Sequence, residues 1–355
     1  MTAVHQFVPT LVRGDAVGHH VLELQTLLRA MGVDSDVFAA EIDPALADAA
    51  RPYGEFTGDA GATLLYHAST ASPVAAFLAA RPEPKVVDYH NVTPPEFFTG
   101  WDPPQATRLR AARLEIATMV GGAALVITHS HFSARDVDAW CRAGSSVLPV
   151  LGASFLDGGQ EPPAVEPSAD TPDASWLFVG RCAPNKAQHE LIKALVIHGR
   201  SYGSRVRLRL VGAPSPPAYR DALVRLAEAA GVADSVELHD SVPAATLASW
   251  YRQADVFVSA SAHEGYCVPV LEAMRFGLPV VARAAGAVPE TAGGAAVLVP
   301  GDSASALAVA AERVHADPAL AERLAAAGRS HVATVLDGGH DAYRATFATY
   351  LERAA

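Results

Sequence analysis

Residues 259–274 read SASAHEGYCVPVLEAM and continue directly from the apolar run of residues 256–258. The pattern predicts a buried strand, a loop of small residues, and a helix that begins near Val268 or Pro269, where proline is tolerated in the first turn. The first turn of a helix presents N–H groups with no partner inside the helix and carries a partial positive charge. This helix start is therefore a candidate site for an anion.

The same order of strand, turn and helix repeats on both sides of this stretch, which predicts right-handed βαβ units and parallel sheets. In the first half, we expect strands at residues 4–8, 33–38, 64–67, 85–90, 125–128 and 147–150. In the second half, we expect them at 176–179, 206–211, 236–238, 256–259, 279–282 and 296–299. Ligands of such sheets bind at the carboxyl ends of the strands, so the site is expected there.

Residues 156–175 interrupt the alternation with two adjacent glycines, four prolines and several acidic residues. We interpret this stretch as an interdomain linker, although a long surface loop within one domain is the alternative. The 355 residues also suggest two domains. We predict α/β domains at 1–160 and 176–335, a linker at 161–175, and a C-terminal segment at 336–355 with a helix at 341–353.

The composition excludes several classes of protein. Hydrophobic residues make up 50% of the chain, which is incompatible with a mostly disordered protein. The chain has 27 Lys and Arg against 38 Asp and Glu, a net charge of −11. A general nucleic-acid binder or a binder of anionic membranes needs a cationic face, so neither class is expected.

The cysteines and the N-terminus point to an ordinary cytoplasmic protein. Cys141, Cys182 and Cys267 are far apart and form no Cys-x-x-Cys pair, so neither a disulfide framework nor a cysteine zinc site is expected. The first residues lack the basic and apolar regions of a signal peptide. No stretch approaches the roughly 18 apolar residues of a membrane span.

A second motif, FVGRCAPNK at residues 178–186, places Arg181 and Lys186 just after a strand. We expect Lys186 to open the next helix. A cation there opposes the helix dipole unless an anion is bound nearby. Arginine offers a bidentate fork and lysine a point charge, a pair that suits a diphosphate. The alternative is two ordinary surface cations.

Two glutamates flank the helix start in the first motif. Glu264 lies in the loop and Glu272 lies eight residues later, inside the expected helix. Carboxylates accept strong, oriented hydrogen bonds from sugar hydroxyls. Two carboxylates beside an anion site therefore suit a ligand with hydroxyls on both sides of a phosphate group. The alternatives are a solvated loop acid for Glu264 and a surface glutamate for Glu272.

Together, Gly-Arg-x-x-Pro-x-Lys and the later Glu-x7-Glu resemble the nucleotide-sugar-binding domain of family 4 glycosyltransferases of the GT-B fold. The resemblance covers residues 176–300. It implies two Rossmann-like, doubly wound parallel-sheet domains that face each other across a cleft. Residues 1–160 would bind the acceptor, residues 176–335 would bind the nucleotide sugar, and the helix of 336–355 would cross back to the N-terminal domain.

The resemblance also implies residue roles. Arg181 and Lys186 would bind the donor diphosphate and stabilise the leaving group, Glu264 would hold sugar hydroxyls, and Glu272 would bind the ribose. The other implied donor-binding residues of this domain are Gly180, Gly265, Tyr266, Cys267 and Val268. Tyr266-Cys267 stands where many relatives have Phe-Gly, and we expect the thiol to be packed rather than nucleophilic.

Gly14 and Asp15 form a loop after the first strand, and by resemblance this loop would cover the donor phosphate. The loop is not Gly-x-Gly-x-x-Gly, and the chain has no P-loop sequence. An ordinary turn with Asp15 as a helix cap is the alternative.

Histidines follow two strands of the first half. By resemblance, His90 would line the donor sugar and help position the reacting centre; a hydrogen-bonded structural histidine is the alternative. His129 and His131 form a His-x-His pair that could bind a metal, but a metal site needs about three or four ligands. We therefore expect these two to be structural and predict no metal. His19 and His20 open the first helix and could face the acceptor.

The resemblance implies retaining transfer from a UDP- or GDP-linked sugar to a hydroxyl acceptor: a small molecule, a glycan or a lipid-linked molecule. The expected setting is glycoconjugate, polysaccharide or natural-product synthesis, with no metal and no cofactor besides the donor. The expected catalytic residues are His90, Arg181, Lys186 and Glu264. The alternatives are a pseudo-glycosyltransferase that couples a cyclitol, a metal-dependent hydrolase using His129 and His131, and a non-catalytic partner that binds a nucleotide sugar. The oligomeric state is left open.

Overall fold

The computed structural model describes residues 3–59, 61–141, 144–152 and 172–354. The chain divides into two compact units. The first unit comprises Met1–Thr99, Pro103–Phe155 and Thr334–Ala355, and the second comprises Gly100–Asp102 and Leu156–Ala333. Among the described residues, no helix combines the length and the apolar character needed to cross a membrane.

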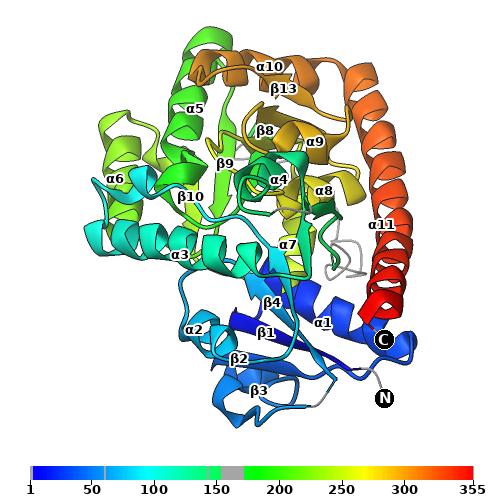
Figure 1. The fold of residues 1–355 in the computed structure, drawn as a ribbon. Helices are drawn as coiled ribbons and strands as arrows, with labels where there is room; N and C mark the ends of the chain where they lie inside the picture. The colour runs from blue at the N-terminus through cyan, green and yellow to red at the C-terminus, as the bar shows by residue number, and fades with distance from the viewer. Residues whose placement is uncertain (1–2, 60, 142–143, 153–171, 355) are drawn as a thin grey trace. The chain divides into compact units, whose positions relative to one another are not determined.

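The first unit is built on a parallel sheet of seven strands in the order β3-β2-β1-β4-β5-β6-β7. Figure 1 labels β1 to β4 of this sheet. The strands are β1 Val4–Leu11, β2 Val37–Ile42, β3 Arg51–Pro52, β4 Thr63–Ala68, β5 Lys85–Tyr89, β6 Leu125–Thr128 and β7 Ser146–Val147. The α-helices up to residue 137 are α1 Ala16–Ala30, α2 Pro73–Ala79, α3 Pro103–Gly121 and α4 His131–Val137, and short 3-10 helices lie at Pro44–Leu46, Tyr53–Glu55 and Pro95–Phe98. The central strands β1, β4 and β5 are buried almost throughout, as the apolar runs predict.

The second unit has a parallel sheet of six strands in the order β10-β9-β8-β11-β12-β13. The strands are β8 Ala174–Val179, β9 Val206–Val211, β10 Val236–His239, β11 Val256–Ser259, β12 Val280–Arg283 and β13 Val297–Val299. The helices are α5 Gln188–Tyr202, α6 Pro217–Ala229, α7 Ala244–Gln253, α8 Val268–Arg275, α9 Val288–Ala292 and α10 Ala304–Ala316, with 3-10 helices at Pro184–Lys186 and Ala233–Ser235. Residues of β8, β9, α5 and α10 form its largest core.

Both sheets reverse their strand order once. In the first unit the reversal falls between β1 and β4, and in the second it falls between β8 and β11. Crossovers leave in opposite directions at such a point, so the loops at the carboxyl ends of the two strands diverge and leave space for a ligand. The two α/β units agree with the predicted fold class.

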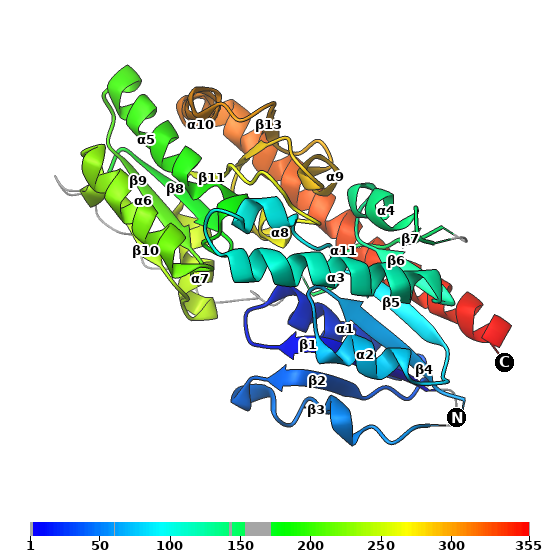
Figure 2. The ribbon, with the colours of Figure 1, turned by 60° about the vertical axis from the view of Figure 1, so that its left-hand side comes forward.

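One helix, α11 (Pro318–Ala354), belongs to both units and runs unbroken from orange to red in Figure 2. In the second unit, His331 Nε2 lies 2.8 Å from the carbonyl oxygen of Thr291. In the first unit, Tyr343 and Phe347 are fully buried among core side chains of α1, β1 and β4–β6. The final 22 residues therefore pack on the N-terminal unit, but the helix begins at residue 318 and not near 341.

Other boundaries differ from the sequence predictions. The second strand spans Val37–Ile42 and not 33–38, although the carbonyl groups of Asp34 and Asp36 already accept bonds from Val4 and Gln6 of β1. The two-residue strand β3 has no hydrophobic alternation to reveal it. Of the predicted linker 161–175, residues 161–171 lie outside the described part of the chain, and β8 already begins at Ala174.

Candidate functional site

The two motifs of the second half lie on neighbouring strands at the reversal point of their sheet. Gly180, Arg181 and Lys186 follow β8, and Glu264 follows β11. The two strands are paired in parallel, with Trp176 beside Val256, so their carboxyl ends lie at the same edge. The sheet therefore brings together residues that are almost 80 positions apart in the sequence.

The turn after β8 is fixed against the end of β9 by two glycines. A Cβ added to Gly212 would lie 2.1 Å from the carbonyl oxygen of Gly180, so a side chain at Gly212 is incompatible with this backbone. The Cys182 N–H donates to Ala213 O at 2.9 Å. Gln188 Nε2 donates to Arg181 O at 2.8 Å, which fixes the main chain of the arginine.

The Arg181 side chain is exposed, and it forms no ion pair within 4.0 Å with a carboxylate of the described residues. The backbone around it is held by the bond from Gln188, and the side chain is exposed. This guanidinium is available to an anionic ligand of the second unit.

Lys186 does not open a helix, contrary to the prediction. It ends the 3-10 helix Pro184–Lys186, and α5 starts only at Gln188, because Ala187 adopts a left-handed conformation with φ of 51° that separates the two. Asn185 is buried and ties this turn to the loop after β11. Its Nδ2 donates to His263 O, and its own carbonyl oxygen accepts the Ala262 N–H at 2.8 Å.

Lys186 and Glu264 form an ion pair, with Nζ and Oε2 separated by 2.6 Å. Their side chains are only 16% and 8% exposed, so the pair is largely withdrawn from water. Each charge depends on the other, because removing one partner of a buried pair leaves an unpaired buried charge. An ammonium has three N–H donors, so two remain for a ligand beside the carboxylate.

Glu264 is also held through its backbone. Gly286, which follows β12 and has a φ of +60°, approaches so closely that an added Cβ would lie 2.5 Å from Glu264 O and 2.8 Å from Glu264 N. The Ala287 N–H donates to Glu264 O at 3.0 Å. The position of the carboxylate therefore depends on a glycine more than 20 residues later.

The helix after this loop, α8, starts at Val268, as predicted. Cys267 precedes it in the left-handed conformation, with φ of 74°, although it is not a glycine. Burial raises the pKa of its thiol well above the ordinary value, and the charge of Glu264 adds to this effect. The thiol stays protonated near neutral pH, which agrees with a packed rather than a nucleophilic cysteine.

Glu272 is buried on the fifth position of α8, so the alternative of a surface glutamate is wrong. The Tyr251 hydroxyl donates to its Oε2 at 2.6 Å. Burial raises the pKa of Glu272 to about 7, and the hydrogen bond from Tyr251 offsets part of this rise. A contact between Glu272 and a ribose remains a prediction.

The raised pKa of Glu272 has a consequence for stability. The folded pKa of about 7 lies above the ordinary value of 4.5, so the folded state holds the proton more tightly. Stability should fall as pH rises from 4.5 to 7 and then level off, by about 3 kcal/mol if the whole shift is realised. Glu272→Gln should be about as stable as the wild type at pH 5 and more stable at pH 8. Denaturant unfolding at both pH values measures this, and equal pH slopes in the two proteins would contradict it.

In the first unit, Gly14 and Asp15 follow β1. Gly14 has a φ of +73° and Asp15 is the N-cap of α1, where its carboxylate accepts the Gly18 N–H at 3.3 Å. The helix-cap alternative for Asp15 therefore holds, and Gly18 lies inside the helix. A contact of this loop with a phosphate stays a prediction.

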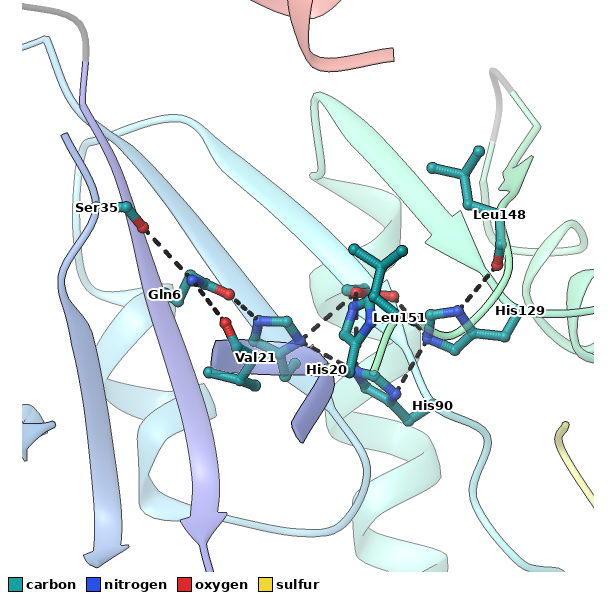
Figure 3. Close-up of polar contacts among 10 residues, drawn as sticks. Gln6, His20, Val21, Ser35, His90, His129, Leu148 and Leu151 are labelled. Atoms are coloured by element: carbon teal, nitrogen blue, oxygen red, sulfur yellow. Dashed lines mark hydrogen bonds and ion pairs between the residues drawn. The ribbon is translucent and has the colours of Figure 1, made fainter. Parts of the chain in front are cut away.

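His90 follows β5, and its side chain is only 4% exposed because it belongs to a buried polar cluster (Figure 3). Asp88 lies at the centre of this cluster. Its carboxylate oxygens lie 2.9 Å from His20 Nε2 and 3.0 Å from His129 Nε2. They also lie 3.5 Å from His67 Nδ1 and 3.8 Å from His90 Nε2.

Both ring nitrogens of His90 are used inside this cluster. Nε2 lies 3.0 Å from His67 Nδ1, and Nδ1 lies 3.0 Å from His129 Nε2. A contact between the His90 ring and a sugar would have to replace one of these bonds. In the structure, His90 is therefore a hydrogen-bonded histidine of the interior, as the alternative proposed. Its contact with the donor sugar remains a prediction.

Burial dominates the ionisation of the cluster. It lowers the pKa of His67 to about 3, and it lowers those of His20 and His90 as well. Burial alone would raise the pKa of Asp88, but the charges and hydrogen bonds of the surrounding histidines hold it well below its ordinary value. Asp88 is therefore a carboxylate at neutral pH.

His67 and Asp88 were not predicted to share a site, and His20 was named only as a residue that could face the acceptor. His20 is fully buried on Asp88 instead. Only their positions in the strands could have revealed the contact. His67 and Asp88 lie near the ends of β4 and β5, where they are direct partners in the parallel pairing. His131 is exposed, outside the cluster that contains His129, so the His-x-His pair does not act as a pair.

Comparisons with known proteins agree with this architecture. Residues 165–331 match the family described as Glycosyl transferases group 1. The D-inositol 3-phosphate glycosyltransferase of Streptomyces griseus subsp. griseus is 35% identical over 190 residues, which are 50% of this chain and 40% of the relative. The enzyme of that name from Actinosynnema mirum is 38% identical over 168 residues, 45% of this chain and 40% of the relative. The chain thus matches less than half the length of these curated relatives.

Solved structures match over nearly the whole chain. Sucrose-phosphate synthase from Thermosynechococcus elongatus has a TM-score of 0.73 at 21% identity, and the match covers 98% of this chain and 100% of that one. Anabaena HepE in complex with UDP and glucose has a TM-score of 0.69 at 19% identity, with 99% of each chain covered. At these identities the likeness establishes the fold.

Proposed function

We propose that this chain, a glycosyltransferase of the GT-B fold whose residues 165–331 belong to the glycosyl transferases group 1 family, moves a sugar from a nucleoside diphosphate sugar to a hydroxyl acceptor. The proposal includes retention of the anomeric configuration, membership of family 4, and transfer without a metal ion at the diphosphate. It rests on one observation above all: the ion pair of Lys186 and Glu264 at the reversal point of the second sheet, beside the start of α8.

The relatives favour a UDP-linked donor. HepE has been solved with UDP, glucose and UDP-glucose, and the curated relatives are named for transfer to an inositol phosphate. In this chain, the two remaining N–H groups of Lys186 and the exposed guanidinium of Arg181 would hold the diphosphate. Glu264 would accept hydrogen bonds from sugar hydroxyls, and Glu272 would accept one from the ribose.

Departure of the nucleoside diphosphate places additional negative charge on the leaving oxygen. Fixed cations stabilise that charge more strongly in the transition state than in the ground state, which is the condition for catalysis. Amides of Gly265 to Val268 would add the partial positive charge of a helix start. The proposal includes front-face transfer without a covalent enzyme intermediate, and the buried, protonated thiol of Cys267 is in keeping with it.

A thermal-shift screen tests the donor assignment. UDP, GDP and ADP and their sugars are added separately to the full chain, and the melting temperature is followed with concentration. A ligand that binds only the folded state raises stability by RT ln(1 + [L]/Kd), about 2.7 kcal/mol at 100 times Kd. We expect a UDP compound to give the largest shift. The absence of a shift with every nucleotide would overturn the proposal, and release of UDP from the best sugar distinguishes an enzyme from a non-catalytic binder.

A further inference from the structure

We propose that His67, Asp88 and His90 form a binding site for a divalent transition-metal ion in the first unit. The site lies at the carboxyl ends of β4 and β5. The sequence predicted no metal, because the His129-x-His131 pair lacked the further ligands that a metal site needs. The proximity of His67, Asp88 and His90 arises from strand pairing alone.

The distances between the three ligand atoms fit a metal ion. His67 Nδ1 lies 3.0 Å from His90 Nε2 and 3.5 Å from Asp88 Oδ2, and His90 Nε2 lies 3.8 Å from Asp88 Oδ2. The point equidistant from three atoms with these separations lies about 2.0 Å from each of them. Zinc bonds to histidine nitrogen and carboxylate oxygen are about 2.0–2.2 Å long. An ion therefore fits among the three atoms with little movement.

The partners of the ligands fix the ring orientations that a metal needs. His67 Nε2 donates to Gln6 Oε1 at 2.8 Å, and Gln6 is oriented by its own bond from Nε2 to Val21 O. His67 Nδ1 is thereby left as the nitrogen with a lone pair. His90 Nδ1 faces His129 Nε2 at 3.0 Å, so Nε2 of His90 is free to ligate once Nδ1 carries the proton. Such outer hydrogen bonds accompany metal-bound histidines almost always.

His20 is close enough to be a fourth ligand, because its Nε2 and the three other atoms all lie within 4.8 Å of one another. However, the Leu151 N–H donates to His20 Nδ1 at 2.9 Å, which leaves the proton of the neutral ring on Nε2. That proton points to Asp88 Oδ2 at 2.9 Å. His20 therefore orients the carboxylate and does not bind the ion.

A count of protons shows what the ion replaces. His67, His90 and His129 form a row of three rings with two contacts between neighbouring rings. At one end His67 contacts Gln6 Oε1, and at the other His129 contacts Leu148 O. These four bonds need four protons, one more than three neutral imidazoles carry. With three neutral rings, one of the four contacts lacks a proton and two nitrogen lone pairs face each other. An ion between His67 and His90 removes the need for a proton at their contact, and the three ring protons then serve the other three contacts.

The donor set indicates the kind of ion. Two imidazoles and one carboxylate suit zinc, iron, nickel or copper, whereas magnesium and calcium prefer oxygen ligands. Because the ligands come from two neighbouring strands and the loop after one of them, we expect the ion to stabilise the first unit. Zinc is used as the probe.

The test compares metal binding by the full-length wild type with that of three single variants. Each protein is treated with a chelator, dialysed, reloaded with zinc or magnesium, freed of unbound ion, and analysed for metal by mass spectrometry. We expect about one zinc and no magnesium per wild-type chain, together with a higher melting temperature in zinc. His67→Asn and His90→Asn should lose the bound zinc and the shift. His131→Asn, which changes an exposed histidine outside the cluster, should keep both.

If a variant is unfolded by circular dichroism, the wild type still decides the question. Cobalt loading should give visible d–d bands of a site with nitrogen and oxygen ligands, and zinc should displace the cobalt. A wild type that retains no zinc and gives no cobalt bands would overturn the proposal. Folded His67→Asn and His90→Asn proteins that retain zinc as the wild type does would also overturn it. None of these measurements depends on glycosyl transfer.

Discussion

Lys186→Ala should reduce sugar transfer by about 10²–10³-fold, the range seen when one preorganised charge-stabilising donor is removed from an active site. The ammonium lies 2.6 Å from Glu264, so its loss affects both charges of the pair. The cation would no longer stabilise the departing diphosphate, and the Glu264 carboxylate would lose its partner. The rate of UDP release from the donor identified by thermal shift measures the effect.

The same substitution should also reduce stability, which has to be separated from the loss of activity. The Glu264 carboxylate left without a partner is only 8% exposed, and we expect the loss of the buried pair to destabilise the second unit by about 3–5 kcal/mol. In Lys186→Ala/Glu264→Gln that charge is absent, so most of the stability should return while transfer stays low. Lys193→Ala, an exposed lysine of α5, should leave both properties unchanged. Undiminished transfer by a folded Lys186→Ala protein would reject the assignment.

The sequence predicted the parts of the site that depend on local pattern. The apolar run 256–259 is the strand β11, and the helix after it begins at Val268 as expected. Lys186 and Glu264 were predicted to share a ligand, and they are in contact. These successes have one cause: in a parallel sheet, motifs that follow neighbouring strands meet at one edge, so strand order and local motifs suffice.

The failures concern features that local pattern does not determine. Lys186 was assigned to a helix, but Ala187 adopts a left-handed conformation that no propensity rule gives for alanine. The helix α11 was expected to begin near 341, where an aromatic stripe marks it, yet it begins at Pro318. Its first turns pack Leu320, Ala321 and Leu324 against the core of the second unit. The cluster around Asp88 needed the register that pairs His67 with Asp88.

Gly286→Ala should strongly disrupt the loop that carries Glu264. The added Cβ would lie 2.5 Å from Glu264 O, and this contact is with main chain, which cannot swing aside as a side chain can. The loop that carries Glu264 would have to shift. Misplacement of a reacting group by about 1 Å can lower a rate by about 10²-fold. We therefore expect transfer to fall by at least about tenfold and the second unit to lose about 2 kcal/mol or more.

Gly301→Ala provides the matched control. Gly301 has a φ of +75°, similar to the +60° of Gly286, but no atom lies within 4 Å of its added Cβ. Both substitutions carry the strain of a left-handed alanine, about 1–2 kcal/mol, and only Gly286→Ala adds the collision with Glu264. Denaturant unfolding and donor turnover are measured for both proteins. If Gly301→Ala retains full turnover while Gly286→Ala loses it, the close approach to Glu264, and not the backbone strain, positions the carboxylate. Equal turnover in the two variants would show that this approach has no part in catalysis.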